Sequence, residues 1–117
     1  MPDPVRGEIW WVDFEPGVGA EARFVRPAVV LSAANYYHLP VRIVVPLTTW
    51  QERFERQPNK VRIPASRANG LDVDSAADAL LVRSASTDRF RSRAGQVEAD
   101  LLADIAAALA VAVAAEL

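Results

Sequence analysis

The stretch that decides the fold runs Glu21-Ala22-Arg23-Phe24-Val25-Arg26-Pro27-Ala28-Val29-Val30-Leu31-Ser32. It opens with polar and charged residues and ends in an apolar run rich in β-branched side chains, which predicts a loop leading into a buried strand. Pro27 fixes its own φ and biases Arg26 toward extended backbone, so the guanidinium is held at the strand entrance. A group held there suits binding of a phosphate or carboxylate, and it equally suits a simple surface ion pair.

Strand-forming segments flank this stretch on both sides. Residues 9–14 carry large side chains on both faces, which predicts a central or covered strand. Residues 41–47 are rich in β-branched residues, and Pro46 marks the end, an edge or a bulge of that strand, because proline cannot donate to a ladder. The remaining turn and strand signals predict strands at 60–64, 78–85 and 95–97, a turn at Asn69-Gly70, and a short helical turn capped by Ser86 or Thr87.

The chain ends in a predicted helix that begins near residue 98. Its apolar stripe consists of Leu101, Leu102, Ile105, Leu109 and Val113. The sequence therefore predicts five to seven short strands followed by one helix. A length of 117 residues fits one domain, which we expect to span residues 1–117.

Composition excludes several classes of protein. The chain has no cysteine, so disulfides, zinc-thiolate sites and cysteine nucleophiles are ruled out. Its first residues do not resemble a signal peptide, and we expect a cytoplasmic protein. The apolar run at 105–115 is about half the length that spans a bilayer, so no membrane segment is expected.

The charge distribution is uneven. A formal net charge of −2 argues against a general nucleic-acid binder. Residues 40–67 nevertheless carry a local basic excess, which suits either a short stretch of polyanion or an ordinary solvated surface. The basic residues of this segment are Arg42, Arg53, Arg56, Lys60, Arg62 and Arg67.

Polar and aromatic side chains gather where the strand at 41–47 ends. Thr48 and Thr49 place two hydroxyls there, and a loop of about ten residues with Trp50 and Phe54 follows. Its length suggests a functional or mobile segment. His38 is the only histidine, and in a connector it suits a surface or packing role more readily than a catalytic one.

Five fragments, in order along nearly the whole chain, carry a resemblance to a known family. They are Arg6-Gly7-Glu8-Ile9-Trp10, Gly19-x-Glu21, Arg26-Pro27-Ala28-Val29-Val30, Val45-Pro46-Leu47-Thr48 and Leu81-Val82-Arg83-Ser84, followed by the terminal helix. With this spacing the chain resembles the MazF/PemK/Kid toxins of toxin–antitoxin systems. The resemblance implies a mainly β fold: a compact, SH3-like (CcdB/PemK-type) β-barrel with a C-terminal α-helix.

The resemblance also implies an activity and partners. The expected protein is a metal-independent, cofactor-free, sequence-specific endoribonuclease that cleaves single-stranded mRNA through the 2′-hydroxyl, leaving a 2′,3′-cyclic phosphate and a 5′-hydroxyl. It is expected to form a homodimer with RNA grooves at the interface and to be neutralised by a small antitoxin. The family's essential arginine and threonine fall on Arg26 and Thr48, and an acidic loop residue falls on Glu21.

The chemistry of these residues agrees with that assignment. Arg26 suits stabilisation of a dianionic phosphorane, Thr48 suits orientation of the phosphate, and Glu21 is a possible general base. Loop side chains are expected to stack on the RNA bases and to contact the RNA backbone. The aromatic side chains among them equally suit packing against the barrel. The predicted RNA-binding residues are Arg23, Phe24, Thr49, Trp50, Phe54 and Arg83.

Two positions depart from the family pattern. Arg23-Phe24 stands where the family usually has Gly-Gly, so we expect a bulkier loop that is less free to adopt positive φ. Ala20 stands where Kid-type members have histidine, and no clear Arg-x-Asp pair lies near Asp78 to Arg83. A simple arrangement of Arg26 and Thr48 is therefore expected rather than a Kid-like division of acid and base roles.

Two other functions fit the same fold. One is a toxin that poisons DNA gyrase through the end of its helix, and the Arg26 and Thr48 pair argues against it. The other is a catalytically silent barrel that binds a peptide or nucleic acid. Incubation of the purified protein with RNA in the presence of a chelator distinguishes these three functions.

Overall fold

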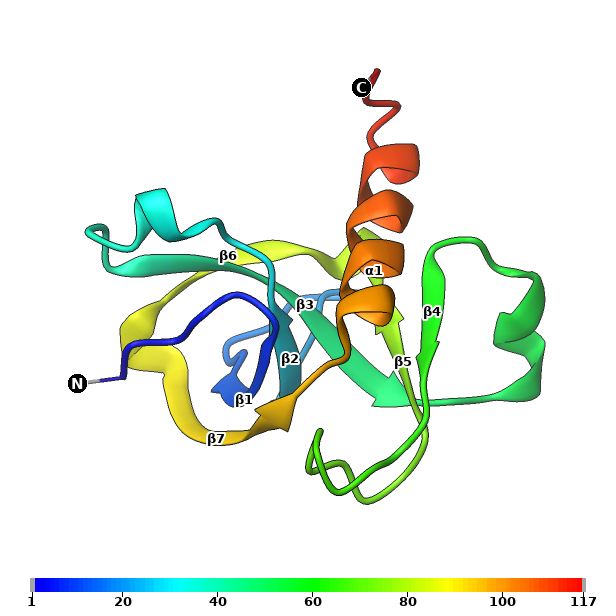
Figure 1. Cartoon of the computed structure of the whole chain (residues 1–117), viewed down its shortest axis with the longest axis horizontal. Coiled ribbons are helices and arrows are strands. Elements are labelled where there is room, and N and C mark those ends of the chain that lie inside the picture. The colour runs from blue at the N-terminus through cyan, green and yellow to red at the C-terminus, as the bar shows by residue number, and fades with distance from the viewer. Residues whose placement is uncertain (1, 117) are drawn as a thin grey trace.

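A computed structural model describes residues 2–116 and shows a curved antiparallel sheet with the helix α1 (Ala99–Ala112) lying across it (Figure 1). The sheet order is β4-β5-β3-β2-β1-β7, and β6 pairs with the first half of β3. The strands are β1 (Glu8–Asp13), β2 (Val25–Val30), β3 (Val41–Thr49), β4 (Lys60–Ile63), β5 (Ser75–Asp78), β6 (Arg83–Ser86) and β7 (Phe90–Gln96). Short 3₁₀ turns are η1 (Ala34–Tyr36), η2 (Glu52–Arg56), η3 (Ala79–Leu81) and η4 (Thr87–Arg89).

The predicted mainly β fold with a C-terminal helix is confirmed. The single strand predicted at 78–85 is wrong, because η3 interrupts it. The Asp78 carboxylate accepts hydrogen bonds from the backbone N–H of Leu80 at 3.0 Å and from Asn59 at 2.9 Å, and this cap turns the chain. The helical turn after Ser86 is present as η4, with Ser86 accepting from the Asp88 N–H at 3.3 Å.

The last strand is longer than predicted and starts at Phe90. Its exposed residues are polar, so no apolar alternation marked it in the sequence. Ion pairs tie it to β1 instead: Arg93 Nε lies 2.7 Å from a Glu8 oxygen, and Arg91 Nη2 lies 2.9 Å from an Asp13 oxygen. Charged cross-strand pairs on an edge strand also discourage pairing with other chains.

The sheet is closed into a barrel-like shape by a loop rather than by a strand pair. Within residues 2–116 no ladder joins β4 to β7, and the loop after β4 spans the gap. The Gln96 N–H donates to the Ala68 carbonyl at 2.9 Å. A Cβ on Gly70 would lie 2.0 Å from the Ala94 oxygen, and one on Gly95 would lie 2.4 Å from the Ala68 oxygen. Only glycine allows the two backbones to come this close.

The core has two parts, one on each face of the central strands. The first is covered by α1, whose Ile105 is fully buried among Ile9, Val29, Val45 and Ile63. Leu101, Leu102 and Leu109 of the predicted stripe pack against it, whereas Val113 lies past the end of the helix and is exposed. The second contains Val12, Phe14, Val30, Val44 and Phe90, enclosed by the curl of the sheet. Alternate residues of β1 thus enter different cores, as the bulk on both its faces predicted.

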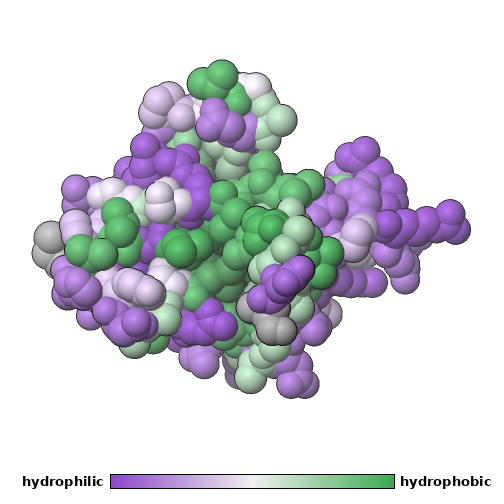
Figure 2. Space-filling model, turned by 90° about the horizontal axis from the view of Figure 1, so that it is seen from above, coloured by the Kyte–Doolittle hydropathy of each residue, from purple (hydrophilic) through white to green (hydrophobic). Residues whose placement is uncertain are grey.

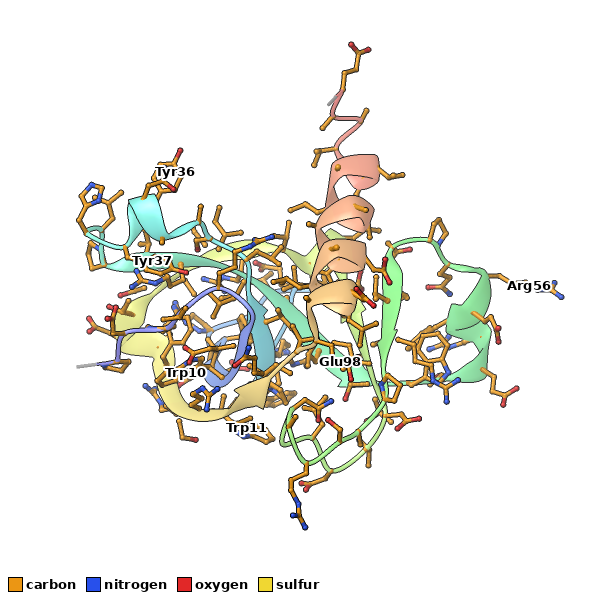
Figure 3. The ribbon with its side chains drawn as sticks, in the orientation of Figure 1. Trp10, Trp11, Tyr36, Tyr37, Arg56 and Glu98 are labelled. Carbon is orange, nitrogen blue, oxygen red and sulfur yellow. The ribbon has the colours of Figure 1, made fainter. Side chains whose placement is uncertain are left out.

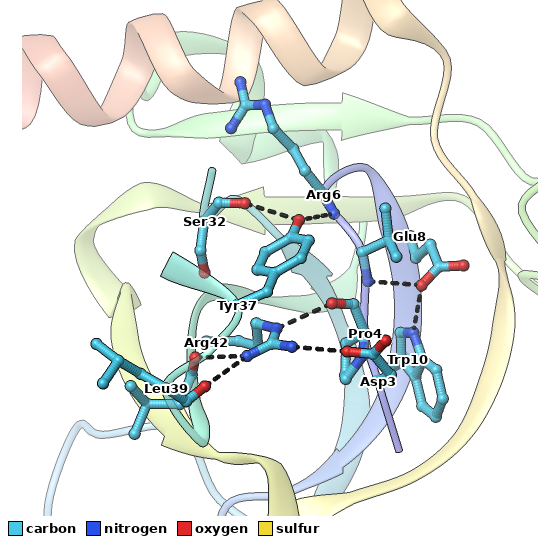
Figure 4. Close-up of polar contacts among 11 residues, drawn as sticks. Asp3, Pro4, Arg6, Glu8, Trp10, Ser32, Tyr37, Leu39 and Arg42 are labelled. Atoms are coloured by element: carbon cyan, nitrogen blue, oxygen red, sulfur yellow. Dashed lines mark hydrogen bonds and ion pairs between the residues drawn. The ribbon is translucent and has the colours of Figure 1, made fainter. Parts of the chain in front are cut away.

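A buried arginine fastens the N-terminal segment to β3 (Figure 4). Arg42 is 2% exposed and donates to the carbonyls of Pro4, Leu39 and Val41 at 2.9–3.0 Å, and it pairs with Asp3 at 3.0 Å. Its guanidinium carbon also lies 4.3 Å from the centre of the Tyr37 ring. Since these partners satisfy the guanidinium, Arg42 is a structural residue and does not contribute to a basic surface.

None of the helices formed by residues 2–116 combines the length and the apolar character that crossing a membrane requires.

The closing contact gives a stability prediction. Gly70→Ala should lower the free energy of unfolding by clearly more than Gly19→Ala in urea denaturation. Both glycines have positive φ, +70° and +60°, so both substitutions carry the left-handed penalty of about 1–2 kcal/mol. Only Gly70 adds a clash with the backbone of β7, whereas the space around Gly19 is open. Equal losses would contradict closure of the sheet at this contact.

Candidate functional site

The main pocket lies where β2 and β3 separate. The two strands pair from Val30–Val44 to Ala28–Pro46, and beyond that point β3 pairs with β5 through Leu47–Ala77, Thr48–Ala76 and Thr49–Ser75. β2 continues beside β1 as far as Val25–Asp13. Pro27 and Pro46 at this point have no amide hydrogen to give to a ladder. A cavity of about 330 Å³ opens between the diverging strand ends.

Arg26 and Thr48 both line this pocket. Each lies two residues beyond the last β2–β3 pair, Ala28–Pro46, so both belong to the part of the strands that diverges around the cavity. Both are half-buried. Arg26 Nε donates to the Arg23 carbonyl at 2.9 Å, and no carboxylate within residues 2–116 forms a salt bridge with its guanidinium. The sequence-level alternative of a surface ion pair is therefore not the arrangement observed.

Phe24 at the mouth of the pocket holds a strained backbone. Its φ is +64°, although a bulky residue at this place was expected to make the loop less free to adopt positive φ. Such a conformation costs about 1–3 kcal/mol for a bulky residue. Two backbone hydrogen bonds hold it: the Phe24 N–H donates to Glu15 Oε1 at 2.6 Å, and its carbonyl accepts from the Phe14 N–H at 2.9 Å. The ring stays 64% exposed, so the strain presents an aromatic face to solvent beside Arg26.

Glu15 clamps this loop electrostatically. Its hydrogen bond from the Phe24 amide, together with the nearby Arg23 guanidinium at 3.6 Å, lowers the pKa of the Glu15 carboxyl below its usual 4.5. At the other end of the same turn the Glu15 N–H donates to the Asp13 carboxylate, and this hydrogen bond lowers the pKa of Asp13. The ion pair with Arg91 lowers it further. The charged forms of both carboxylates thus favour the observed loop.

Glu21 lies away from Arg26 and Thr48. Its carboxylate accepts from the Val18 N–H at 2.9 Å, and it lines a separate cavity of about 130 Å³ together with Arg83 and η3. Arg83 donates to the Ser84 carbonyl at 3.2 Å, and its guanidinium carbon lies 5.8 Å from the centre of the Phe14 ring. The two cavities share no lining residue. The structure therefore groups Glu21 with Arg83 and groups Arg26 with Thr48.

The other predicted RNA-binding residues divide in the same way. Phe24 and Thr49 line the main pocket, and Arg23 lies on the loop beside it. Trp50 and Phe54 instead pack edge to face on the hairpin arm formed by η2 and β4, with ring centres 5.8 Å apart. Phe54 is 6% exposed, and Trp50 is half-buried under Arg62. Phe54 thus supports Trp50 rather than offering a free face.

The local basic excess is partly neutralised. Lys60 pairs with Asp78 at 3.2 Å, and Arg62 pairs with Asp74 at 3.0 Å. Arg56 points away from the body at the tip of the projecting arm (Figure 3). The charge available to an anion is therefore smaller than the sequence suggested.

Sequence reasoning assigned several residues that line the pocket to no site, among them Trp11, Asp72 and Val73. Trp11 was assigned only to a strand, and its pairing with Pro27 is what brings it beside Arg26. Asp72 and Val73 follow the Asn69-Gly70 turn and reach the pocket because that loop closes the sheet. The β-propensity of Trp11 and the Asn69-Gly70 turn signal predicted local structure. Neither signal indicates which strand or loop lies beside the residue in the fold. Within residues 2–116 no three histidine or carboxylate side chains come together in a way that would hold a metal ion.

The sheet order and the C-terminal helix define a fold class with solved members. The chain matches the model of the PemK-like, MazF-like toxins of type II toxin–antitoxin systems over residues 5–113. It is similar to Endoribonuclease MazF9 of Mycobacterium tuberculosis strain ATCC 25618 / H37Rv, with 38% identity over 110 residues, 89% of this chain and 91% of that protein. The chain therefore belongs to the PemK-like, MazF-like toxin family.

Solved structures agree on the fold. MazF (Form-I) from Deinococcus radiodurans has a TM-score of 0.81 and 26% identity, over 97% of this chain and 99% of that one. A chain of the MazE-MazF (Form-III) structure from the same organism has a TM-score of 0.76 and 26% identity, over 98% of this chain and 100% of that one.

The strain at Phe24 predicts a stabilising substitution. Phe24→Asn should raise the free energy of unfolding by about 0.5–1 kcal/mol in urea denaturation, because asparagine tolerates positive φ and the exposed ring loses little burial. The control is Val25→Asn, an equally polar change at an exposed strand position in pairing with Asp13, which should destabilise. A loss of stability in Phe24→Asn would show that the ring contacts outweigh the strain.

The Glu15 clamp predicts a pH dependence. A lowered pKa means that its contribution is present above about pH 4.5 and is lost as pH falls through the folded-state pKa. The parent should therefore be more stable than Glu15→Gln at pH 7, and urea titrations should show the difference narrowing at pH 3. Glu55→Gln, on the exposed side of η2, is the matched control and should change stability little at either pH. A difference that stays constant with pH would rule out the charged clamp.

Proposed function

We propose that this protein is a toxin that acts as a metal-independent, sequence-specific endoribonuclease on single-stranded mRNA. The observation that carries the proposal is that Arg26 and Thr48 line one pocket at the β2–β3 fork and that the Arg26 guanidinium forms no salt bridge with any carboxylate of residues 2–116. The name of the Mycobacterium tuberculosis relative, an endoribonuclease, supports the reaction type. We place the whole activity in one domain that acts in the cytoplasm.

In the proposed mechanism the 2′-hydroxyl of the RNA attacks the adjacent phosphorus. The P–O5′ bond breaks as the 2′-hydroxyl proton passes to a base and the departing 5′-oxygen takes a proton from water, so the products carry a 2′,3′-cyclic phosphate and a 5′-hydroxyl. Arg26 stabilises the dianionic phosphorane with two N–H groups, since a guanidinium is always charged and matches two phosphate oxygens. Thr48 donates its hydroxyl to a non-bridging oxygen and fixes the phosphate in line.

Proton transfer needs a further group, because Arg26 is too weak a base. Glu21 remains our proposal for the base. To act as one, it has to leave the Val18 amide and its cavity beside Arg83, so the loop of residues 15–24 must move when RNA binds. Movement of a strained loop is physically reasonable, since strain at Phe24 brings its alternative conformation closer in energy.

RNA is held in this proposal by two groups of side chains. Arg23, Phe24 and Thr49 surround the pocket, where an exposed ring and a cation suit a base and its phosphate. Trp50, backed by Phe54, and Arg83 extend the contact to neighbouring nucleotides.

The proposed protein partners are a second copy of the chain and a small antitoxin. An apolar groove of about 210 Å³ lies between α1 and η3, and it is bordered by the exposed side chains of Leu80 and Val111. Apolar area shows on the face of the molecule from which α1 projects (Figure 2). Exposed apolar surface of this kind suits a protein contact. The MazE-MazF structure from Deinococcus radiodurans supports an antitoxin as partner.

One experiment tests the proposal. Purified protein incubated with a mixed-sequence RNA in EDTA should cleave it and leave 5′-hydroxyl ends. Arg26→Ala should lower the rate roughly a hundred- to a thousandfold, as loss of an oxyanion donor does, and Thr48→Ala should lower it less. The stability of both variants should change by no more than about 1 kcal/mol, because both residues lie at strand ends.

Arg26→Lys is the matched control, because it keeps the charge and removes the planar fork. It should remain strongly impaired if two phosphate oxygens are bound at once. Cleavage by folded Arg26→Ala at close to the parent rate would refute the assignment. Absence of cleavage by the parent itself would favour a gyrase-directed or purely binding protein.

A further inference from the structure

The main pocket contains one acidic residue, which a phosphate site does not need. Among the described residues that line it, Asp72 is the only carboxylate, and it shares the cavity with Arg26. A carboxylate repels phosphate, so its presence here calls for a different ligand group. Acceptor oxygens facing a bound RNA are suited to the N–H donors of a base edge.

Asp72 is exposed and unengaged, whereas its neighbour is not. Asp74 accepts from the Ala65 N–H at 2.9 Å and pairs with Arg62 at 3.0 Å, and these contacts lower the pKa of its carboxyl. No hydrogen bond or ion pair between residues of the described chain uses the Asp72 carboxylate. Its four acceptor lone pairs are available to a ligand.

The backbone on both sides of Asp72 is fixed. The Leu71 N–H donates to Asn69 Oδ1 at 3.0 Å, and the Leu71 side chain is buried in the core. After Asp72 the Asp74 carbonyl accepts from the Trp50 N–H at 2.9 Å. A short segment held at both ends presents Asp72 and Val73 to the pocket in a defined position.

The rest of the pocket offers flat apolar surfaces. Trp11, Phe24, Pro27 and Val73 line it, and Phe24 and Val73 are more than half exposed. Aromatic faces of this kind stack on unpaired bases. A volume of about 330 Å³ lies at the lower end of ligand pockets, which suits a single base rather than several.

We propose that this pocket binds a guanine base of the substrate and that Asp72 is the residue that selects it. Guanine is the base that presents two adjacent donors, N1–H and N2–H, which match the two oxygens of a carboxylate. Adenine and cytosine pair their amino group with a ring acceptor, and uracil places carbonyls on both sides of its single N–H, so each sets a lone pair against the carboxylate. This inference rests on the proposed ribonuclease function and adds a specificity residue to it.

The test uses the intact protein and a random-sequence RNA in EDTA, with cleavage sites mapped by sequencing. The parent should favour guanine at one position of the site, and Asp72→Asn should lose that preference roughly ten- to a hundredfold. Inosine in place of that guanine removes the N2–H donors, so it should slow the parent and leave Asp72→Asn unaffected. Fluorescence anisotropy with 2′-deoxy-substituted oligonucleotides gives the same comparison for binding without cleavage.

Asp88→Asn is the matched control, because it removes the same charge from an exposed aspartate outside the pocket. It should keep the guanine preference. The inference is overturned if the parent has no guanine preference, if Asp72→Asn keeps it, or if Asp72→Asn slows all sequences equally. A parent that cleaves no RNA at all instead refutes the proposed function, and this result is distinct because it appears before any variant is compared.

Discussion

The change of partner along β3 is the constraint on which the site depends. Its first half pairs with β2 and β6, and its last three residues pair with β5. A nine-residue strand that serves two parts of one curved sheet must leave β2 somewhere, and prolines at 27 and 46 locate that point. Arg26 and Thr48 lie two residues beyond the shared ladder, so they are fixed by strands and still face an open cavity.

The loops around the fork are held in place by contacts from residues outside the pocket. Glu15 and the Phe14 amide hold Phe24 in a conformation that it would not adopt alone, and Gly70 and Gly95 allow the loop of Asp72 to reach β7. Two segments far apart in sequence therefore line one pocket. The strained segment carries an aromatic ring and the other carries a carboxylate, so they differ in chemistry.

Local signals in the sequence predicted the strands and the helix well, but they predicted poorly which segments lie side by side. Proline and β-branched patterns located β2 and β3, and the apolar stripe located α1, because these depend on residues close in the chain. The predicted strand at 78–85 failed because an aspartate cap at Asp78 overrides strand propensity. Trp11 and Asp72 were missed because their place in the pocket is set by pairing and loop closure. Arg42 belongs to the basic segment of the sequence, but it is buried and hydrogen-bonded to the carbonyls of Pro4, Leu39 and Val41, which lie both near and far in the chain.

Opposite charges that line one small pocket also affect how a nucleic acid binds in it. A carboxylate raises the energy of a nearby phosphate, and a guanidinium lowers it. A bound strand therefore gains most when its phosphate lies on the Arg26 side and its base on the Asp72 side. The reverse orientation places both groups against a like charge or an unsuited partner. The two charges thus favour one placement of phosphate and base in the pocket, and the pocket itself opens where β3 leaves β2.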